Sequence, residues 1–164
     1  MRPLRGSPNS RPKSTEILGV DIGGVIIDRE NDRSDTSFFG DRYLETTAVP
    51  GAFEALEILS RRFRTYLVSK CGPKTERRTL EWLRHHRFYE RTGIGPEDVR
   101  FCRERKDKAP ICVELGITHF VDDHLEVLQY LESVPCKYLF GAHSEPVPEG
   151  IVKVESWKDL LSQF

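Results

Sequence analysis

The sequence predicts an α/β protein with a central parallel sheet of five to six strands and helices on both faces. Short apolar runs typical of buried strands alternate along the chain with segments whose apolar residues recur at helical spacing. Glycine and proline residues mark the breaks between these segments. Such alternation is typical of a parallel sheet that helices cover on both sides, in three layers. In these sheets reactive groups gather at the carboxyl ends of the strands, which are therefore the expected place for a functional site.

Composition limits the class of protein. A length of 164 residues and a hydrophobic content of 38% fit one domain with one core. The formal net charge of −1 argues against a globally basic nucleic-acid binder. No apolar run has the length needed to span a bilayer, and no secretory apolar region is present. None of the four cysteines forms a C-x-x-C pair, which argues against a zinc site. We expect a cytoplasmic protein with free thiols and no membrane association.

The chain begins with a polar segment. Residues 1–15 contain three prolines, several serines and four basic residues, with almost nothing to bury, so we expect a disordered tail. A targeting peptide is the alternative because the segment lacks acids, although its prolines disfavour an amphipathic helix. The domain is then 16–164. Its first predicted strand is the apolar run 17–20, and residues 28–49 are polar and irregular.

Helical spacing defines the next elements. Pro50-Gly51 opens a predicted helix whose apolar face is formed by Phe53, Leu56, Leu59 and Phe63. The run 65–69 is the second strand. Pro73 then suits the first position of a helix, which takes its apolar stripe from Leu80, Leu83 and Phe88.

The second half of the chain repeats the pattern. A break at 93–96 contains two glycines and a proline, and a helix centred on 111–115 ends near Gly116. Leucines at helical spacing predict another helix over 125–131, and a closing helix is expected over 157–163. The strands predicted in this half are 99–102, 118–121, 137–140 and, as a sixth, 151–154.

Charge is unevenly distributed. Residues 61–91 hold ten lysines and arginines against three glutamates, and residues 114–164 hold three lysines against nine acids. Such a basic stretch is usually a solvated helix face, and a phosphate-rich partner such as nucleic acid is the alternative.

Polar residues follow three of the predicted strands. Asp21 follows the first strand, Ser69 ends the second, and Asp122 and Asp123 follow the fourth. An ionised aspartate can attack phosphorus, and Mg²⁺ is held by one or two carboxylates with water. Asp21 is therefore a candidate nucleophile and metal ligand, with Asp122 and Asp123 completing the metal site. Ser69, with amides at the following turn, can hold phosphate oxygens.

Two further groups complete the set. The backbone carbonyl of Gly23 can be another ligand of Mg²⁺, and a lysine can supply positive charge to the transferring phosphoryl group. Lys108, which opens the helix before the fourth strand, is the candidate, and Lys106 is its competitor.

Taken in order, these residues resemble the motifs of the haloacid dehalogenase (HAD) superfamily. Asp21 fits the first motif, Ser69 the second, Lys108 the third and Asp122-Asp123 the fourth, over roughly residues 16–141. The resemblance implies a Rossmann-like, HAD-like fold and a Mg²⁺-dependent phosphatase that works through an aspartyl-phosphate.

Gly23 departs from the family pattern. The family's first motif carries a second aspartate at this position as general acid and base, and glycine cannot transfer a proton. Because such help is worth ~10²–10⁴-fold, slow turnover is one expectation. A catalytically inactive relative that binds a phosphorylated ligand or partner is the alternative. Asp28 on the following loop is a candidate substitute for the missing acid.

The gaps between the motifs are short. Neither the stretch 28–49 nor the span from Ser69 to Lys108 is long enough for a full cap domain. An open site suits a phosphorylated macromolecule or an extended substrate, or a site closed by a partner subunit. A nucleic-acid end phosphatase is a weaker possibility. The histidines at 85, 86, 119 and 124 are expected in packing or in solvent rather than on a metal.

Overall fold

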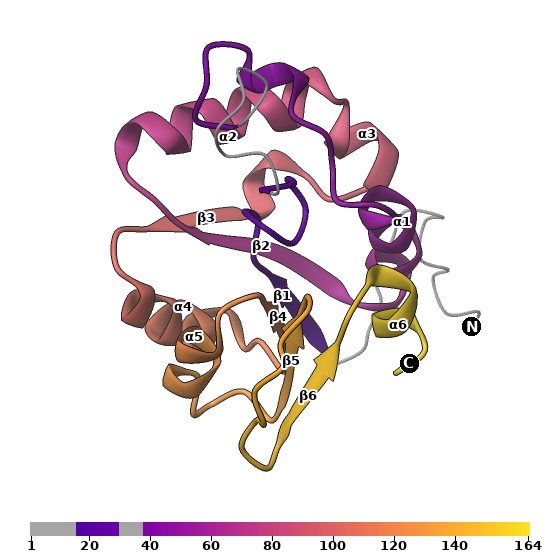
Figure 1. The fold of residues 1–164 in the computed structure, drawn as a ribbon, viewed down its shortest axis with the longest axis vertical. Coiled ribbons are helices and arrows are strands. Elements are labelled where there is room, and N and C mark those ends of the chain that lie inside the picture. The colour runs from indigo at the N-terminus through magenta and orange to yellow at the C-terminus, as the bar shows by residue number, and fades with distance from the viewer. Residues whose placement is uncertain (1–15, 30–37) are drawn as a thin grey trace, which may run out of the picture.

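The computed structural model describes residues 16–29 and 38–164 (Figure 1), so the predicted tail 1–15 lies outside the described residues. The described chain forms a six-stranded sheet in which every neighbouring pair is parallel. Its spatial order is β3-β2-β1-β4-β5-β6. The strands are β1 (Ile17–Val20), β2 (Arg64–Lys70), β3 (Val99–Cys102), β4 (His119–Asp122), β5 (Cys136–Phe140) and β6 (Ile151–Val154). The predicted fold class is confirmed, including the sixth strand.

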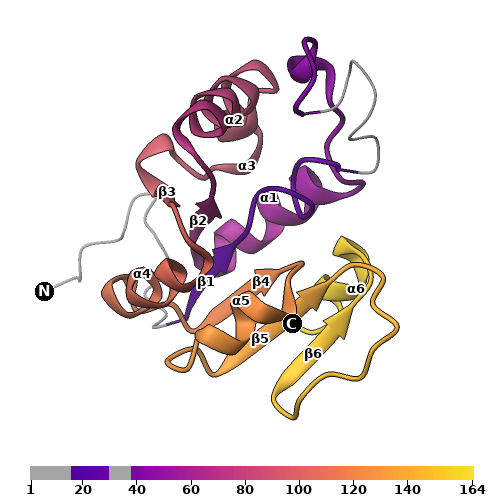
Figure 2. The same ribbon diagram turned by 60° about the vertical axis from the view of Figure 1, so that its left-hand side comes forward.

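Helices cover both faces of the sheet, which gives three layers (Figures 1 and 2). On one face lie α1 (Ala52–Arg62), α2 (Pro73–His85), α3 (Phe88–Thr92) and α6 (Trp157–Leu161). On the other face, α4 (Lys108–Leu115) packs beside α5 (Leu125–Tyr130). Short 3-10 helices span Tyr43–Glu45, Pro96–Asp98 and Arg105–Asp107.

Alternation along the strands divides the apolar side chains between two cores. Leu18 and Val20 of β1 face the core under α1, which also buries Trp82 and Trp157. Gly19, between them, faces the core under α4 and α5, where a Cβ atom would lie only 2.6 Å from the Phe120 ring. Glycine at this position therefore lets the ring of β4 pack directly on the backbone of β1.

One predicted helix is two helices in the structure. The stripe of Leu80, Leu83 and Phe88 predicted a single helix, but α2 ends at His85 and Phe88 begins α3. The break falls at Arg87, whose φ of 56° is left-handed and incompatible with a continuing α-helix. Leu83 and Phe88 nevertheless share the same core, because the turn brings both to the sheet side.

The described part of the segment after β1 folds back over the sheet. Backbone bonds join Ile27 to Ile22 and Val49 to Ile26, and the indole of Trp82 donates to the Thr46 carbonyl at 2.9 Å. The described part of 28–49 thus lies against α2. Within the described residues, no helix has both the length and the apolar character needed to cross a membrane.

Candidate functional site

Asp21 and Asp122 are neighbours because β1 and β4 are adjacent and parallel. Val20 pairs with Val121 in register, and the Asp21 amide donates to the Val121 carbonyl at 3.0 Å. Asp21 therefore follows the end of β1 beside Asp122, the last residue of β4. Both are buried, at 6% and 0% exposure. Parallel topology thus concentrates two carboxylates at one edge of the sheet.

Lys108 compensates this buried negative charge. Its ammonium donates to Asp21 Oδ1 at 3.0 Å and to Asp122 Oδ2 at 2.8 Å, and the side chain is 3% exposed. Burial acts to lower the pKa of Lys108, but the two carboxylates outweigh it and raise that pKa above its ordinary value. Lys106, by contrast, is exposed and pairs with Glu104 at 3.5 Å. The structure therefore places Lys108, and not Lys106, in the carboxylate cluster.

The nucleophile candidate carries unbalanced negative charge around it. Burial is the largest cause that raises the pKa of Asp21, and the Asp122 carboxylate raises it further, while Lys108 opposes both. Lys108 thus offsets only part of the effect that burial and the neighbouring carboxylates have on the pKa of Asp21. An additional cation beside Asp21 would lower that pKa and favour the carboxylate that can act as a nucleophile.

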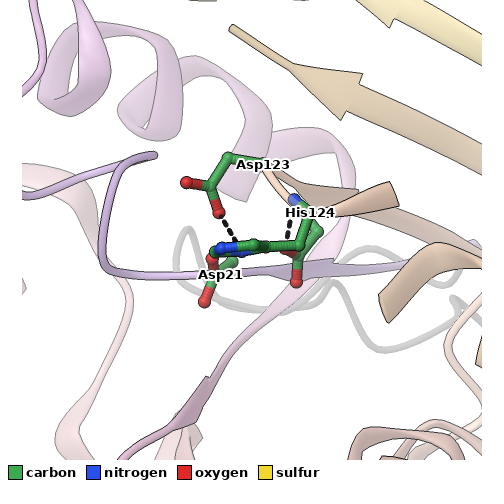
Figure 3. Close-up of side chains that lie close together, drawn as sticks. Asp21, Asp123 and His124 are labelled. Atoms are coloured by element: carbon green, nitrogen blue, oxygen red, sulfur yellow. Dashed lines mark hydrogen bonds and ion pairs between the residues drawn. The ribbon is translucent and has the colours of Figure 1, made fainter. Parts of the chain in front are cut away.

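Asp123 and His124 complete the cluster (Figure 3). His124 Nδ1 lies 2.9 Å from Asp123 Oδ1, and the His124 amide donates to Asp122 Oδ1 at 2.9 Å. The carboxylates of Asp122 and Asp123 raise the pKa of His124 to about 9, so its imidazole is protonated at neutral pH. Burial opposes ionisation of Asp123, yet His124 and neighbouring groups hold the pKa of this carboxyl below its ordinary value.

The donor set fits a hard divalent cation. Asp21, Asp122 and Asp123 each offer a carboxylate oxygen, and these atoms and a ring nitrogen of His124 lie within 4.8 Å of one another. The raised pKa of His124 favours the imidazolium, which is not a metal ligand. Both oxygens of Asp122 already accept hydrogen bonds, from Lys108 and from His124. Asp123 Oδ1 is buried, and although His124 Nδ1 lies 2.9 Å away, the contact lacks the geometry of a hydrogen bond. Carboxylate oxygens are typical ligands of Mg²⁺, so Asp21 and Asp123 are the best-placed ligands here.

Two glycines shape the loop beside this cluster. Gly24 has a left-handed φ of 80°, and a Cβ there would lie 2.3 Å from Asp123 Oδ2. Gly23 has no such constraint, and the hydrogen bonds that join Ile27 to this loop use Ile22 and Gly24. Neither of those bonds uses the carbonyl of Gly23, the predicted further metal ligand.

A cavity of about 150 Å³ opens beside the cluster. Asp21, Ser69 and Lys108 line it together, although they come from the residue after β1, from β2 and from α4. The lining also includes the cationic side chains of Arg29, Lys70, Arg105 and His124, and the rings of Phe38 and Phe39. A cavity with one nucleophilic carboxylate and several cations suits an anionic substrate.

Some predictions for the site differ from the structure. His124 was expected in packing or solvent, but it lies in the acidic cluster. Asp28, considered as a substitute acid, is not among the described residues that line the cavity. The turn after Ser69 was expected to offer free amides, but the Cys71 amide donates to the Cys102 carbonyl at 3.0 Å. Arg29 and Arg105 carried no signal in the sequence, because only the fold brings them to the cavity.

The basic stretch 61–91 is not one helix face. Its residues are distributed over α1, β2, α2 and α3. Several of them are engaged by neighbours: Arg61 by Glu57, Arg64 by Asp98, Arg87 by Glu90 and Arg91 by Glu54. These pairs reduce the charge available to a nucleic acid.

The fold and the site together define a three-layer α/β protein with a carboxylate and lysine centre at the carboxyl edge of its sheet. Among solved structures, the chain is similar to a protein of Burkholderia xenovorans LB400 described as a "putative haloacid dehalogenase-like hydrolase". The TM-score is 0.62, the identity is 14%, and the match covers 90% of this chain and 95% of the other. No protein-family model and no curated protein matches the sequence. At this identity the likeness establishes a HAD-like fold.

Proposed function

We propose that this protein is a Mg²⁺-dependent phosphatase-like hydrolase that acts through Asp21. The observation that carries the proposal is the convergence of Asp21, Lys108, Asp122 and Asp123 at one sheet edge, next to a cavity that Asp21, Lys108 and Ser69 line. The HAD-like fold supports it, because the same edge holds the motifs that the sequence resembles.

The side chains divide the chemistry between them. The Asp21 carboxylate attacks phosphorus and forms an aspartyl-phosphate while the leaving group departs. Water then hydrolyses this acyl phosphate by attack on phosphorus and restores the carboxylate. Lys108 and Ser69 hold the oxygens of the phosphoryl group, and Lys108 also fixes Asp21 in place. Mg²⁺, when bound by Asp21 and Asp123, would supply charge neutralisation for the nucleophile and the phosphate.

A second candidate function rests on Gly23. With glycine at this position, the site lacks the aspartate that would transfer protons in the resembled motif. A protein that binds a phosphorylated ligand or partner without turnover needs the cations and the metal but no proton donor. The same cavity would then serve recognition alone.

A panel of phosphorylated compounds, assayed with and without Mg²⁺, distinguishes the two functions. We expect Mg²⁺-dependent phosphate release by the wild-type protein and none by Asp21→Asn, because an amide is a poor nucleophile. An Asp41→Asn variant, altered at an exposed aspartate outside the cavity lining, is the matched control. Binding of phosphate or vanadate without any release of phosphate would support the binding protein and reject the enzyme.

A further inference from the structure

The position of the missing proton donor faces an arginine. A Cβ atom built on Gly23 would lie 3.5 Å from Nη1, 3.6 Å from Cδ and 3.7 Å from Cζ of Arg29. Gly23 and Arg29 both line the cavity, together with Asp21. A guanidinium therefore lies at the place where the resembled motif would present a carboxylic acid.

Arg29 and Lys108 line the same cavity but differ in burial. Its side chain is exposed, and its guanidinium carbon is 5.8 Å from the centre of the Phe39 ring, which also lines the cavity. Lys108 is buried beneath Asp21 and Asp122. A phosphoryl group attacked by Asp21 therefore has two cations near it. Lys108 lies beside Asp21, and Arg29 lies beside Gly23 on the loop that follows the nucleophile.

Arginine and aspartate help a leaving group in different ways. A carboxylic acid donates a proton to an alkoxide, whereas a guanidinium remains protonated at neutral pH and can only donate hydrogen bonds. Its planar fork matches the paired oxygens of a carboxylate or a phosphate. An arginine at this place therefore suits a leaving group that departs as a stable oxyanion, and it does little for an alcohol.

We propose that Arg29 binds the leaving group, and that the substrates are acyl phosphates or phosphoanhydrides rather than phosphate esters of alcohols. This inference rests on the proposed function, since it assigns the substrate class of the same site.

The reaction balances without a proton donor at residue 23. An Asp21 oxygen bonds to phosphorus as the bond from phosphorus to the bridging oxygen breaks. The electron pair stays on that oxygen, which leaves as a carboxylate or phosphate anion beside Arg29. A water oxygen then bonds to phosphorus, the bond to Asp21 breaks, and the proton released by water ends on the product phosphate. The products are the leaving anion, dihydrogen phosphate and the restored Asp21 carboxylate.

The kinetic test compares substrates that differ in their leaving group. Acetyl phosphate and pyrophosphate leave an oxyanion, and glycerol phosphate leaves an alkoxide. We expect Arg29→Gln to lower kcat/KM on the first two by ~10²–10³-fold, the loss typical of one removed oxyanion donor, with a loss below about threefold on glycerol phosphate. Arg29→Lys should recover part of the loss, because it restores the charge but not the fork.

Arg61→Gln is the matched control, because Arg61 is exposed on α1 and pairs with Glu57 outside the cavity lining. It should leave all three substrates unchanged. Equal losses on all substrates in Arg29→Gln would overturn the inference and place Arg29 on the transferred phosphoryl group. No loss on any substrate would show that Arg29 does not bind substrate.

A binding experiment separates this inference from the proposed function. In an Asp21→Asn background, which cannot turn over, calorimetry with Mg²⁺ should show tighter binding of pyrophosphate than of inorganic phosphate. Arg29→Gln should remove that preference. If the wild-type protein shows no turnover but prefers pyrophosphate in a way that depends on Arg29, the proposed enzymatic function is rejected and the leaving-group site at Arg29 is retained. If Asp21→Asn binds the two anions with equal affinity both with and without Arg29→Gln, the leaving-group site is rejected.

Discussion

The Lys108 ammonium lies 3.0 Å from Asp21 Oδ1, across 87 residues of sequence. This contact joins the first residue of α4 to the end of β1, and both partners are buried. Because Lys108 also bonds to Asp122, it holds the two carboxylates of adjacent strands in one arrangement. The pair explains how a folded core tolerates two neighbouring aspartates before any metal binds.

Lys108→Met should destabilise the metal-free protein. The change removes the cation and leaves Asp21 and Asp122 buried without it, for which a loss of about 3–5 kcal/mol in the free energy of unfolding is typical. Urea denaturation at pH 7 measures the loss. The control is Lys106→Met, because Lys106 is exposed and pairs only loosely with Glu104 at 3.5 Å. Equal stability of the two variants would contradict the ion-pair account.

Gly23→Asp should fold and change the substrate range. The site accepts a Cβ, since the nearest atom is Arg29 Nη1 at an ordinary contact distance of 3.5 Å. The new carboxylate would pair with Arg29, which favours its ionised form and opposes its use as an acid. The new acid should raise the turnover of glycerol phosphate, but only by ~10²-fold, the lower end for general acid catalysis, because Arg29 restrains it. In the double variant Gly23→Asp/Arg29→Gln the turnover should rise further. Steady-state kinetics on glycerol phosphate measures both. A double variant no faster than Gly23→Asp alone would show that Arg29 does not restrain the acid.

Gly24→Ala tests the close approach of the loop to Asp123. The added Cβ would lie 2.3 Å from Asp123 Oδ2 at a φ of 80°, so either the carboxylate or the loop must move. We expect a loss of about 1–3 kcal/mol in stability and weaker Mg²⁺ binding by calorimetry. Gly72→Ala is the control, because a Cβ there meets no atom within 4 Å. Unchanged Mg²⁺ affinity in Gly24→Ala would argue against Asp123 as a ligand.

Most of the fold was predictable because the strands and most of the α-helices have a local signal. Strand runs such as 17–20 and the helical stripe of α1 follow from apolar spacing alone, and parallel topology follows from their alternation. The break between α2 and α3 carried no signal, because Arg87 adopts a left-handed conformation without being a glycine. Motif spacing also does not distinguish between two lysines that lie two positions apart. Only the burial of Lys108 and the exposure of Lys106 in the structure separate the two candidates.

The cavity walls were less predictable than the cluster. Asp21, Asp122 and Asp123 stand at strand ends, where topology fixes their convergence. Arg29 reaches the cavity from an irregular segment and Arg105 from a short 3-10 helix, and the paths of both depend on tertiary packing. His124 follows two aspartates, and only the geometry shows that its ring turns back toward Asp123 (Figure 3).

His119 should make the stability sensitive to acid. Its ring is buried among Phe63, Tyr138 and Phe164, and burial lowers its pKa below the ordinary 6.5, although Glu16 at 3.5 Å opposes the shift. The unfolded chain then binds a proton more readily than the folded one, so stability falls as pH drops from about 6.5 through the lowered pKa. In His119→Gln this loss should be smaller, with a remainder from His86, whose pKa burial also lowers, whereas His85→Gln at an exposed histidine of α2 should retain the full loss. Urea denaturation at pH 7.5 and pH 5 measures the difference, and an equal acid-induced loss in all three proteins would show that His119 is not the group responsible.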